Sequence, residues 1–171
     1  MIVTFPFIGN HFCPRSTPER IVAIMARFET EVELPAPAAT LFEFFLRPSN
    51  VQKIAPPELG LAFVEAPELV TVGTRLKFKV QSWGQVQSME HEIITLDAPT
   101  LIHERQVRGL FKRWEHWHEF RQTGTGTVVR DVIEFDRPGG VIGLLVTESK
   151  ILDQLEEGFE HRHDKLRGLF A

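Results

Sequence analysis

The C-terminal end of the chain carries the pattern that most restricts the fold. From Leu145 to Phe170, apolar side chains recur at steps of three and four residues, which places them on one face of a helix. Glu148 and Arg162 lie on the same stripe, and Gly158 interrupts it at a cost of about 1 kcal/mol relative to alanine. Because a long helix with one apolar face needs a large surface to cover it, the preceding residues must supply that surface.

The segment 26–34 has the other simple period. One of its faces carries three glutamates, and the opposite face carries Phe28, Thr30, Val32 and Leu34. A period of two predicts a strand with one buried face. Pro35 and Pro37 end this strand.

Two short helices and a run of strands are predicted next. The first helix follows Pro37, which is tolerated in a first helical turn, and Pro48 stops it. The second begins near Ser49 and stops at Pro56. Alternating segments bounded by turn residues then predict six further strands, at residues 61–66, 74–83, 85–96, 101–107, 112–122 and 127–136.

This order of elements predicts an α+β fold. A curved antiparallel sheet of about six to seven strands wraps around the long C-terminal helix, and the two short helices that follow the first strand close one end. The inward side chains of such a sandwich do not all meet. An apolar cavity is therefore expected between the sheet and the helix.

We predict one domain over residues 25–171 and a separate N-terminal extension over residues 1–24. A chain of 171 residues suits a single core. The extension contains three prolines and no clean period, whereas alternation begins directly after Met25. Met25 is therefore a candidate for the natural start of the protein. The other interpretation is a genuine arm that packs on the domain.

Composition argues against several classes of protein. The formal net charge is -4 and the basic residues are scattered, which argues against nucleic-acid binding. The single cysteine, Cys13, excludes an internal disulfide and indicates the cytoplasm. The longest apolar stretch, 141–146, is too short for a bilayer, so no integral membrane association is expected. The 14 phenylalanines and the absence of tyrosine favour an apolar cavity. The oligomeric state stays open.

Alternation also places polar side chains on the concave side of the sheet. His116 and His118 share a face with two aromatic residues, and Asp131 shares a face with apolar residues on the next strand. Glu104 and His91 lie on the two preceding strands. Four neighbouring strands are thus expected to bring these five side chains onto one wall.

Three interpretations of this acid–histidine cluster stay open. In the structural one, buried histidines and carboxylates satisfy each other by hydrogen bonds and fix the strand register. In the second, they orient a carbonyl or hydroxyl group of a ligand. In the third, they act in chemistry: His116 and His118 reach one metal ion with Asp131 or Glu104 as a third ligand, or a His–Asp pair acts as a general base.

Three stretches of the chain resemble the SRPBCC superfamily, also called START-like or birch-allergen-like. They are FETEVELPAPAATLFEFFLRPSNVQKIAPP (28–57), RGLFKRWEHWHEF (108–120) and GTVVRDVIEFDRPGG (126–140), and the resemblance covers residues 26–170. The chain is most similar to the bacterial polyketide cyclase/dehydrase-like, ligand-binding branch. It departs from that branch at Gly109–Leu110–Phe111, where Gly-Pro-Phe is usual. The resemblance implies a helix-grip fold and apolar ligands such as lipids, sterols and polyketides, and it supplies no universal catalytic motif.

We expect the chain to bind an apolar or amphipathic small molecule (a lipid, polyketide or aromatic compound) in the cavity, as a carrier or sensor. The alternative is a cyclase/dehydrase-type enzyme; its activity stays undecided, with His116, His118 and Asp131 as catalytic candidates. A third possibility is a protein-binding surface around Trp117 and residues 1–24. No cofactor and no metal ligand are assigned. The expected ligand-binding residues are Phe28, Phe78, Met89, Glu104, Trp114, His116, His118, Phe120, Asp131, Ile133, Phe135, Leu155 and Phe159.

Overall fold

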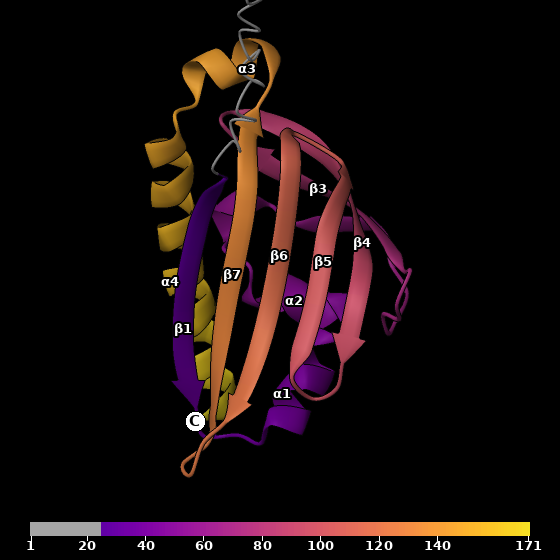
Figure 1. Cartoon of the computed structure of the whole chain (residues 1–171), viewed down its shortest axis with the longest axis vertical. Helices are drawn as coiled ribbons and strands as arrows, with labels where there is room; N and C mark the ends of the chain where they lie inside the picture. The colour runs from indigo at the N-terminus through magenta and orange to yellow at the C-terminus, as the bar shows by residue number, and fades with distance from the viewer. Residues whose placement is uncertain (1–24) are drawn as a thin grey trace, which may run out of the picture.

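A single antiparallel sheet forms the body of the molecule in the computed structural model, which describes residues 25–171 (Figure 1). The extension predicted over residues 1–24 lies outside the described residues. The seven strands are β1 (Ala26–Leu34), β2 (Ala62–Glu65), β3 (Arg75–Ser82), β4 (Gln85–Asp97), β5 (Leu101–Arg108), β6 (Phe111–Gln122) and β7 (Thr127–Pro138). Their order in the sheet is β1-β7-β6-β5-β4-β3-β2, so the first strand pairs with the last.

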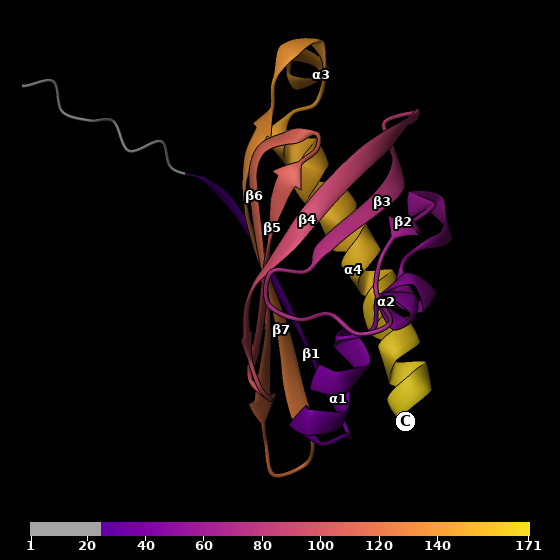
Figure 2. The ribbon, with the colours of Figure 1, turned by 90° about the vertical axis from the view of Figure 1, so that its right-hand side faces the viewer.

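The long helix and the two short helices that follow the first strand lie on the concave side of this curved sheet, and a further short helix lies beyond the end of β7 (Figure 1 and Figure 2). Figure 2 shows the longest one crossing the concave side diagonally, with the two short helices that follow β1 beside its C-terminal half. The predicted α+β, helix-grip architecture is confirmed. The helices are α1 (Ala38–Phe45), α2 (Pro48–Ile54), the short 3₁₀ helix η1 (Pro57–Leu59), α3 (Gly140–Leu145) and α4 (Glu148–Phe170).

Local sequence explains where several of these elements begin and end. Pro48 occupies the first turn of α2, so this helix starts one residue before the predicted position at Ser49. Trp83 and Gly84 both have positive φ, 48° and 75°, and join β3 to β4. A two-residue loop of this kind matches the right-handed twist of paired strands. The turn predicted at this position is therefore present.

The C-terminal helix starts later than its apolar pattern predicts. The stripe indicates a helix from Leu145, but Leu145 ends α3 and the next two residues are extended. The side chain of Thr147 accepts a hydrogen bond from the backbone N–H of Lys150 and so caps α4. This cap places the first residue of α4 at Glu148. None of the helices within residues 25–171 is long and apolar enough to cross a bilayer.

Two groups of buried apolar side chains fix the sheet against the helices. The first joins α1 to β6 and to the C-terminal end of α4, through residues such as Phe45, Phe120 and Leu166. The second joins β7 to the first half of α4, through residues such as Phe135 and Ile151. Their side chains do not fill all the space under α4, and the remaining space is the candidate site.

Candidate functional site

The larger of two adjoining cavities has a volume of about 620 Å³. Its walls come from α4, from strands β3, β4, β6 and β7, and from the segment around η1. The side chains that line this cavity are mostly apolar, because the apolar members of each alternating strand point inward. Seven residues predicted to contact a ligand line it, namely Phe78, Met89, Trp114, His116, Ile133, Leu155 and Phe159.

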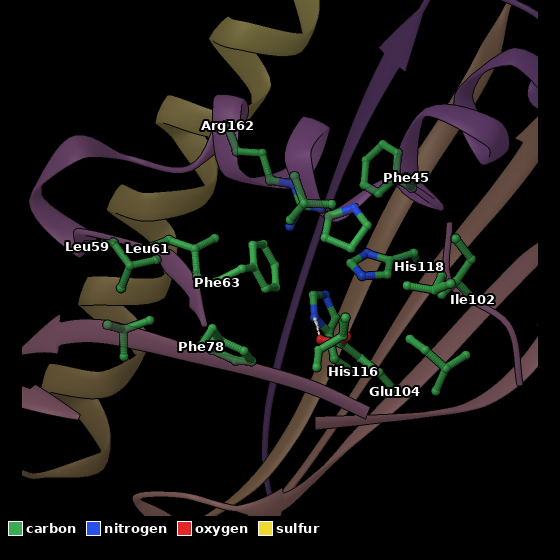
Figure 3. Close-up of a pocket in the computed structure, with 16 residues that line it drawn as sticks. Phe45, Leu59, Leu61, Phe63, Phe78, Ile102, Glu104, His116, His118 and Arg162 are labelled. Carbon is green, nitrogen blue, oxygen red and sulfur yellow. Dashed lines mark ion pairs between the residues drawn. The ribbon is translucent and has the colours of Figure 1, made fainter. Parts of the chain in front are cut away.

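The smaller cavity has a volume of about 170 Å³ and adjoins the polar cluster (Figure 3). Phe78, His116 and Arg162 border both cavities. Glu104 and His118 border the smaller one only. The two spaces therefore share a boundary that includes His116 and Arg162, and a ligand in the larger cavity lies close to these polar groups.

Two predicted contact residues pack behind the cavity walls on β7. Phe135 is fully buried and contacts Phe111 and Trp114, so its ring supports the wall rather than forming it. Asp131 is also fully buried and borders neither cavity. Both residues lie on the inward face of β7, as their alternation predicts, but other side chains cover them.

Phe28 and Phe120 also line neither cavity. Phe28, on the edge strand β1, packs on Phe159 with ring centroids 5.4 Å apart. Phe120 lies against Phe42 and Phe45 of α1, at centroid distances of 5.7 and 5.3 Å. Periodicity predicts the face on which such a ring lies, but not whether a helix covers it.

The acid–histidine cluster forms as the alternation predicts. Nε2 of His116 lies 3.0 Å from Oδ1 of Asp131, and Nδ1 of His118 lies 2.5 Å from the same oxygen. On the other side, Nδ1 of His91 lies 3.2 Å from Oε1 of Glu104. Nδ1 of His116 lies 3.6 Å from that oxygen, so His116 stands between the two carboxylates.

Burial and neighbouring charges shift the pKa values of the cluster's carboxylates in opposite directions. Burial favours the neutral form of each group. At Glu104, contacts with His116 and His91 outweigh burial and hold the pKa well below its usual value. At Asp131, the positive charge of Arg162 and the contacts with both histidines do the same.

The pKa values of the two central histidines, His116 and His118, shift in opposite directions. Asp131 and Glu104 raise the pKa of His116 despite its burial. Burial and the neighbouring charge of His116 lower the pKa of His118 to about 4. At neutral pH, His118 is therefore neutral while His116 holds its proton more tightly than an exposed histidine.

Arg162 lies on the apolar stripe of α4, and its spacing alone predicts no role for it. Its guanidinium carbon lies 4.9 Å from the ring centroid of Phe45 and 5.2 Å from that of Phe159. Nη1 lies 3.9 Å from Oδ1 of Asp131. Within residues 25–171, its buried Nε and Nη2 have no hydrogen-bond partner. A basic residue on an apolar helix face is the sequence signal that identifies it.

A family model matches most of this structure. Residues 25–162 match the model described as "Polyketide cyclase / dehydrase and lipid transport". The chain belongs to this family. The match includes the whole sheet and the part of α4 that carries Arg162. It confirms the superfamily that the three sequence stretches resemble.

Solved structures of the same shape support the fold alone, because their sequences have diverged far from this one. Protein CV1439 from Chromobacterium violaceum is 18% identical with a TM-score of 0.66, covering 84% of this chain and 96% of its own. A START superfamily protein from Mycobacterium smegmatis is 15% identical with a TM-score of 0.65, covering 84% and 96%. Ara h 8.0201 is 15% identical with a TM-score of 0.59, covering 85% and 97%. No curated protein matches the sequence.

Proposed function

We propose that this chain binds an apolar or amphipathic small molecule between α4 and the sheet, as a carrier or sensor. The observation that carries the proposal is the larger cavity of about 620 Å³ with its mostly apolar walls. Small-molecule sites commonly have volumes of roughly 300–1,000 Å³ and an apolar lining with a few polar groups. Membership in a family described by polyketide cyclisation and lipid transport supports the same class of ligand.

Arg162 supports a ligand that carries an oxygen acceptor. Two of its buried nitrogens, Nε and Nη2, lack a hydrogen-bond partner among the described residues, and the side chain borders both cavities. An unsatisfied buried donor costs about 1–3 kcal/mol, so a carbonyl or hydroxyl oxygen of the ligand gains by filling this position. The apolar part of the same molecule then occupies the larger cavity.

A fluorescent amphipathic probe tests the proposal on delipidated protein. Trp83 and Trp114 line the larger cavity, so energy transfer from tryptophan to bound cis-parinaric acid reports occupancy. We expect saturable binding of one probe per chain, displaced by unlabelled lipids. A probe that never saturates, together with no ligand in native mass spectra across lipid and aromatic panels, would falsify the proposal.

A cavity-blocking variant locates the binding. A Cβ at Gly158 meets only Pro56 Cγ at 3.8 Å, so Gly158→Leu enters the cavity without backbone strain. We expect it to weaken probe binding by roughly tenfold or more, since the leucine takes up ligand volume. Gly168→Leu, on the same helix and with nothing within 4 Å of its Cβ, is the matched control. Equal binding by both variants would place the probe outside the cavity.

The second candidate is a cyclase/dehydrase-type enzyme. Its supporting observation is the hydrogen-bonded pair of His118 and Asp131 beside the smaller cavity, in which Asp131 orients the imidazole as in a general base. This candidate predicts turnover of a poly-β-ketone thioester and its loss in His118→Gln, with cis-parinaric acid still bound. Binding without any turnover favours the carrier or sensor.

A further inference from the structure

Three potential metal ligands converge beside the smaller cavity. Glu104 on β5 pairs directly with His116 on β6, and His118 lies two residues further along the same face. One ligand atom from each of the three side chains lies within 4.8 Å of the others. In Figure 3 all three point from the sheet into the same space. Two imidazoles and one carboxylate form a donor set that suits zinc, iron, cobalt or nickel.

Asp131 fixes which histidine nitrogens are free to bind a metal. Its Oδ1 accepts hydrogen bonds from Nε2 of His116 and from Nδ1 of His118. Those nitrogens must then carry hydrogen, which leaves the lone pairs on Nδ1 of His116 and Nε2 of His118. Metal-binding histidines almost always donate their other N–H to such an outer partner. Asp131 therefore acts as an orienting residue and not as a ligand.

Glu104 is oriented in a similar way. Nδ1 of His91 lies 3.2 Å from Oε1 of Glu104, and no hydrogen bond or ion pair within residues 25–171 engages Oε2. Oε1 lies 3.6 Å from Nδ1 of His116, which is too long for a good hydrogen bond. Neighbouring donors in a tetrahedral site with bonds of about 2.0–2.1 Å lie roughly 3.4 Å apart. The observed spacing is therefore close to that of two ligands of one ion.

Charge balance favours a cation in this position. Asp131 is fully buried and Glu104 is half-buried, and Arg162 lies 3.9 Å from Oδ1 of Asp131. An ion bound by His116 displaces the proton that the two carboxylates hold on this residue, and the two carboxylates with Arg162 then leave one negative charge for the ion. A buried charge is costly unless it is paired or bound to a metal.

We propose that Glu104, His116 and His118 bind one divalent transition-metal ion, oriented by Asp131 and His91, with its remaining coordination positions open to the smaller cavity. The site does not depend on the apolar-ligand function proposed above. An ion there would also accept an oxygen atom of a ligand in the adjoining space. Zinc is the probe of choice for affinity, and cobalt reports the geometry by its visible absorption.

The test uses the full, untagged chain after removal of metals with a chelator. Calorimetry with Zn²⁺ should give one site per chain, and Co²⁺ should give the visible bands of a site with nitrogen and oxygen donors. Imidazole NMR of the unmodified protein should show Zn²⁺ shifting His116 and His118 first. Failure of Zn²⁺ to saturate the folded protein, or first shifts at His161 and His163 instead, would overturn the proposal.

Variants separate ligands from bystanders. Glu104→Gln and His118→Gln should each weaken Zn²⁺ binding by roughly a hundredfold, and loss of an orienting partner in Asp131→Asn by about 10–100-fold. The matched control is His103→Gln, because His103 pairs with Glu115 on the other face of the sheet. Circular dichroism verifies that each variant is folded. Equal Zn²⁺ affinity in Glu104→Gln, His118→Gln and the control would contradict the site. Binding of cis-parinaric acid is measured separately in the presence of chelator, so it reports on the cavity alone.

Discussion

Oδ1 of Asp131 on β7 lies 3.0 Å from Nε2 of His116 on the neighbouring strand β6. The carboxylate is fully buried, and the same oxygen also contacts His118. A buried carboxylate is tolerated only where partners compensate for its lost hydration. Asp131 therefore ties the polar cluster to the centre of the sheet, and its removal affects stability as well as the site.

Asp131→Asn should lower the free energy of unfolding by about 3 kcal/mol, because breaking a buried ion pair leaves its partners uncompensated. Urea unfolding followed by circular dichroism measures the change. The matched control is Asp136→Asn on the same strand, where the partly exposed carboxylate lies 3.8 Å from Arg113. That change should stay within about 0.5 kcal/mol. Similar losses in both variants would mean that Asp131 is not specially stabilising.

The metal-free protein should lose stability as the pH falls from 6.5 toward 4. The pKa of His118 is about 4 in the fold, against 6.5 for an unperturbed histidine. The unfolded state therefore binds the proton first across this window, and the free energy of unfolding decreases as the pH falls. His116 acts with the opposite sign: its raised pKa adds stability below 6.5 that is lost at higher pH.

Urea unfolding at several pH values in the presence of chelator measures this dependence. Replacing His118 with glutamine removes its titration and should flatten the curve between pH 6.5 and 4. An imidazole NMR titration that finds His118 protonating near 6.5 would contradict the expected shift.

The fold was predictable because its two periods are unusually clear. Alternation in 26–34 and in 127–136 predicts two strands, and they pair as β1 and β7 in the structure. The stripe from Leu145 predicts the helix that covers them. What the pattern does not contain is the cap at Thr147, which starts α4 three residues later. A threonine within a continuous apolar stripe gives little warning of such a break.

The sequence predicts on which face of the sheet the site residues lie, but not how deeply each of them is buried. Alternation placed His116, His118 and Asp131 on one wall, and their contacts agree with that placement. It gave no means of telling that Asp131 lies behind the histidines, because depth depends on packing between strands and helices. The role of Arg162 was also missed, since spacing alone treats it as one more member of the stripe.

Gly126→Ala should destabilise the turn between β6 and β7 by about 1–3 kcal/mol. A Cβ there would lie 2.1 Å from the backbone oxygen of Leu34, at the end of β1, so the turn or the strand must move. Gly124→Ala in the same turn is the control, because its Cβ meets nothing within 4 Å. Thermal unfolding compares them, and equal midpoints would show that β1 adapts without cost.

Arg162→Met should weaken binding of an oxygen-bearing ligand selectively. Methionine keeps most of the apolar stem but removes the guanidinium donors, whose carbon lies over the rings of Phe45 and Phe159. Displacement of cis-parinaric acid by a long-chain methyl ketone and by the alkane of equal length measures the effect, in the presence of chelator. A hydrogen bond to a charged donor contributes about 1.5–3 kcal/mol, so the ketone should lose roughly tenfold or more while the alkane is unchanged.

The ratio of the two affinities is the informative quantity, because partial unfolding of the variant lowers both equally. Arg167→Met provides the control on the same helix, since Arg167 is exposed and pairs with Asp164 at 2.9 Å. It should leave both affinities as they are. If the ketone keeps its advantage over the alkane in Arg162→Met, the acceptor oxygen binds elsewhere, and the metal site beside Glu104 becomes the position to test for that oxygen.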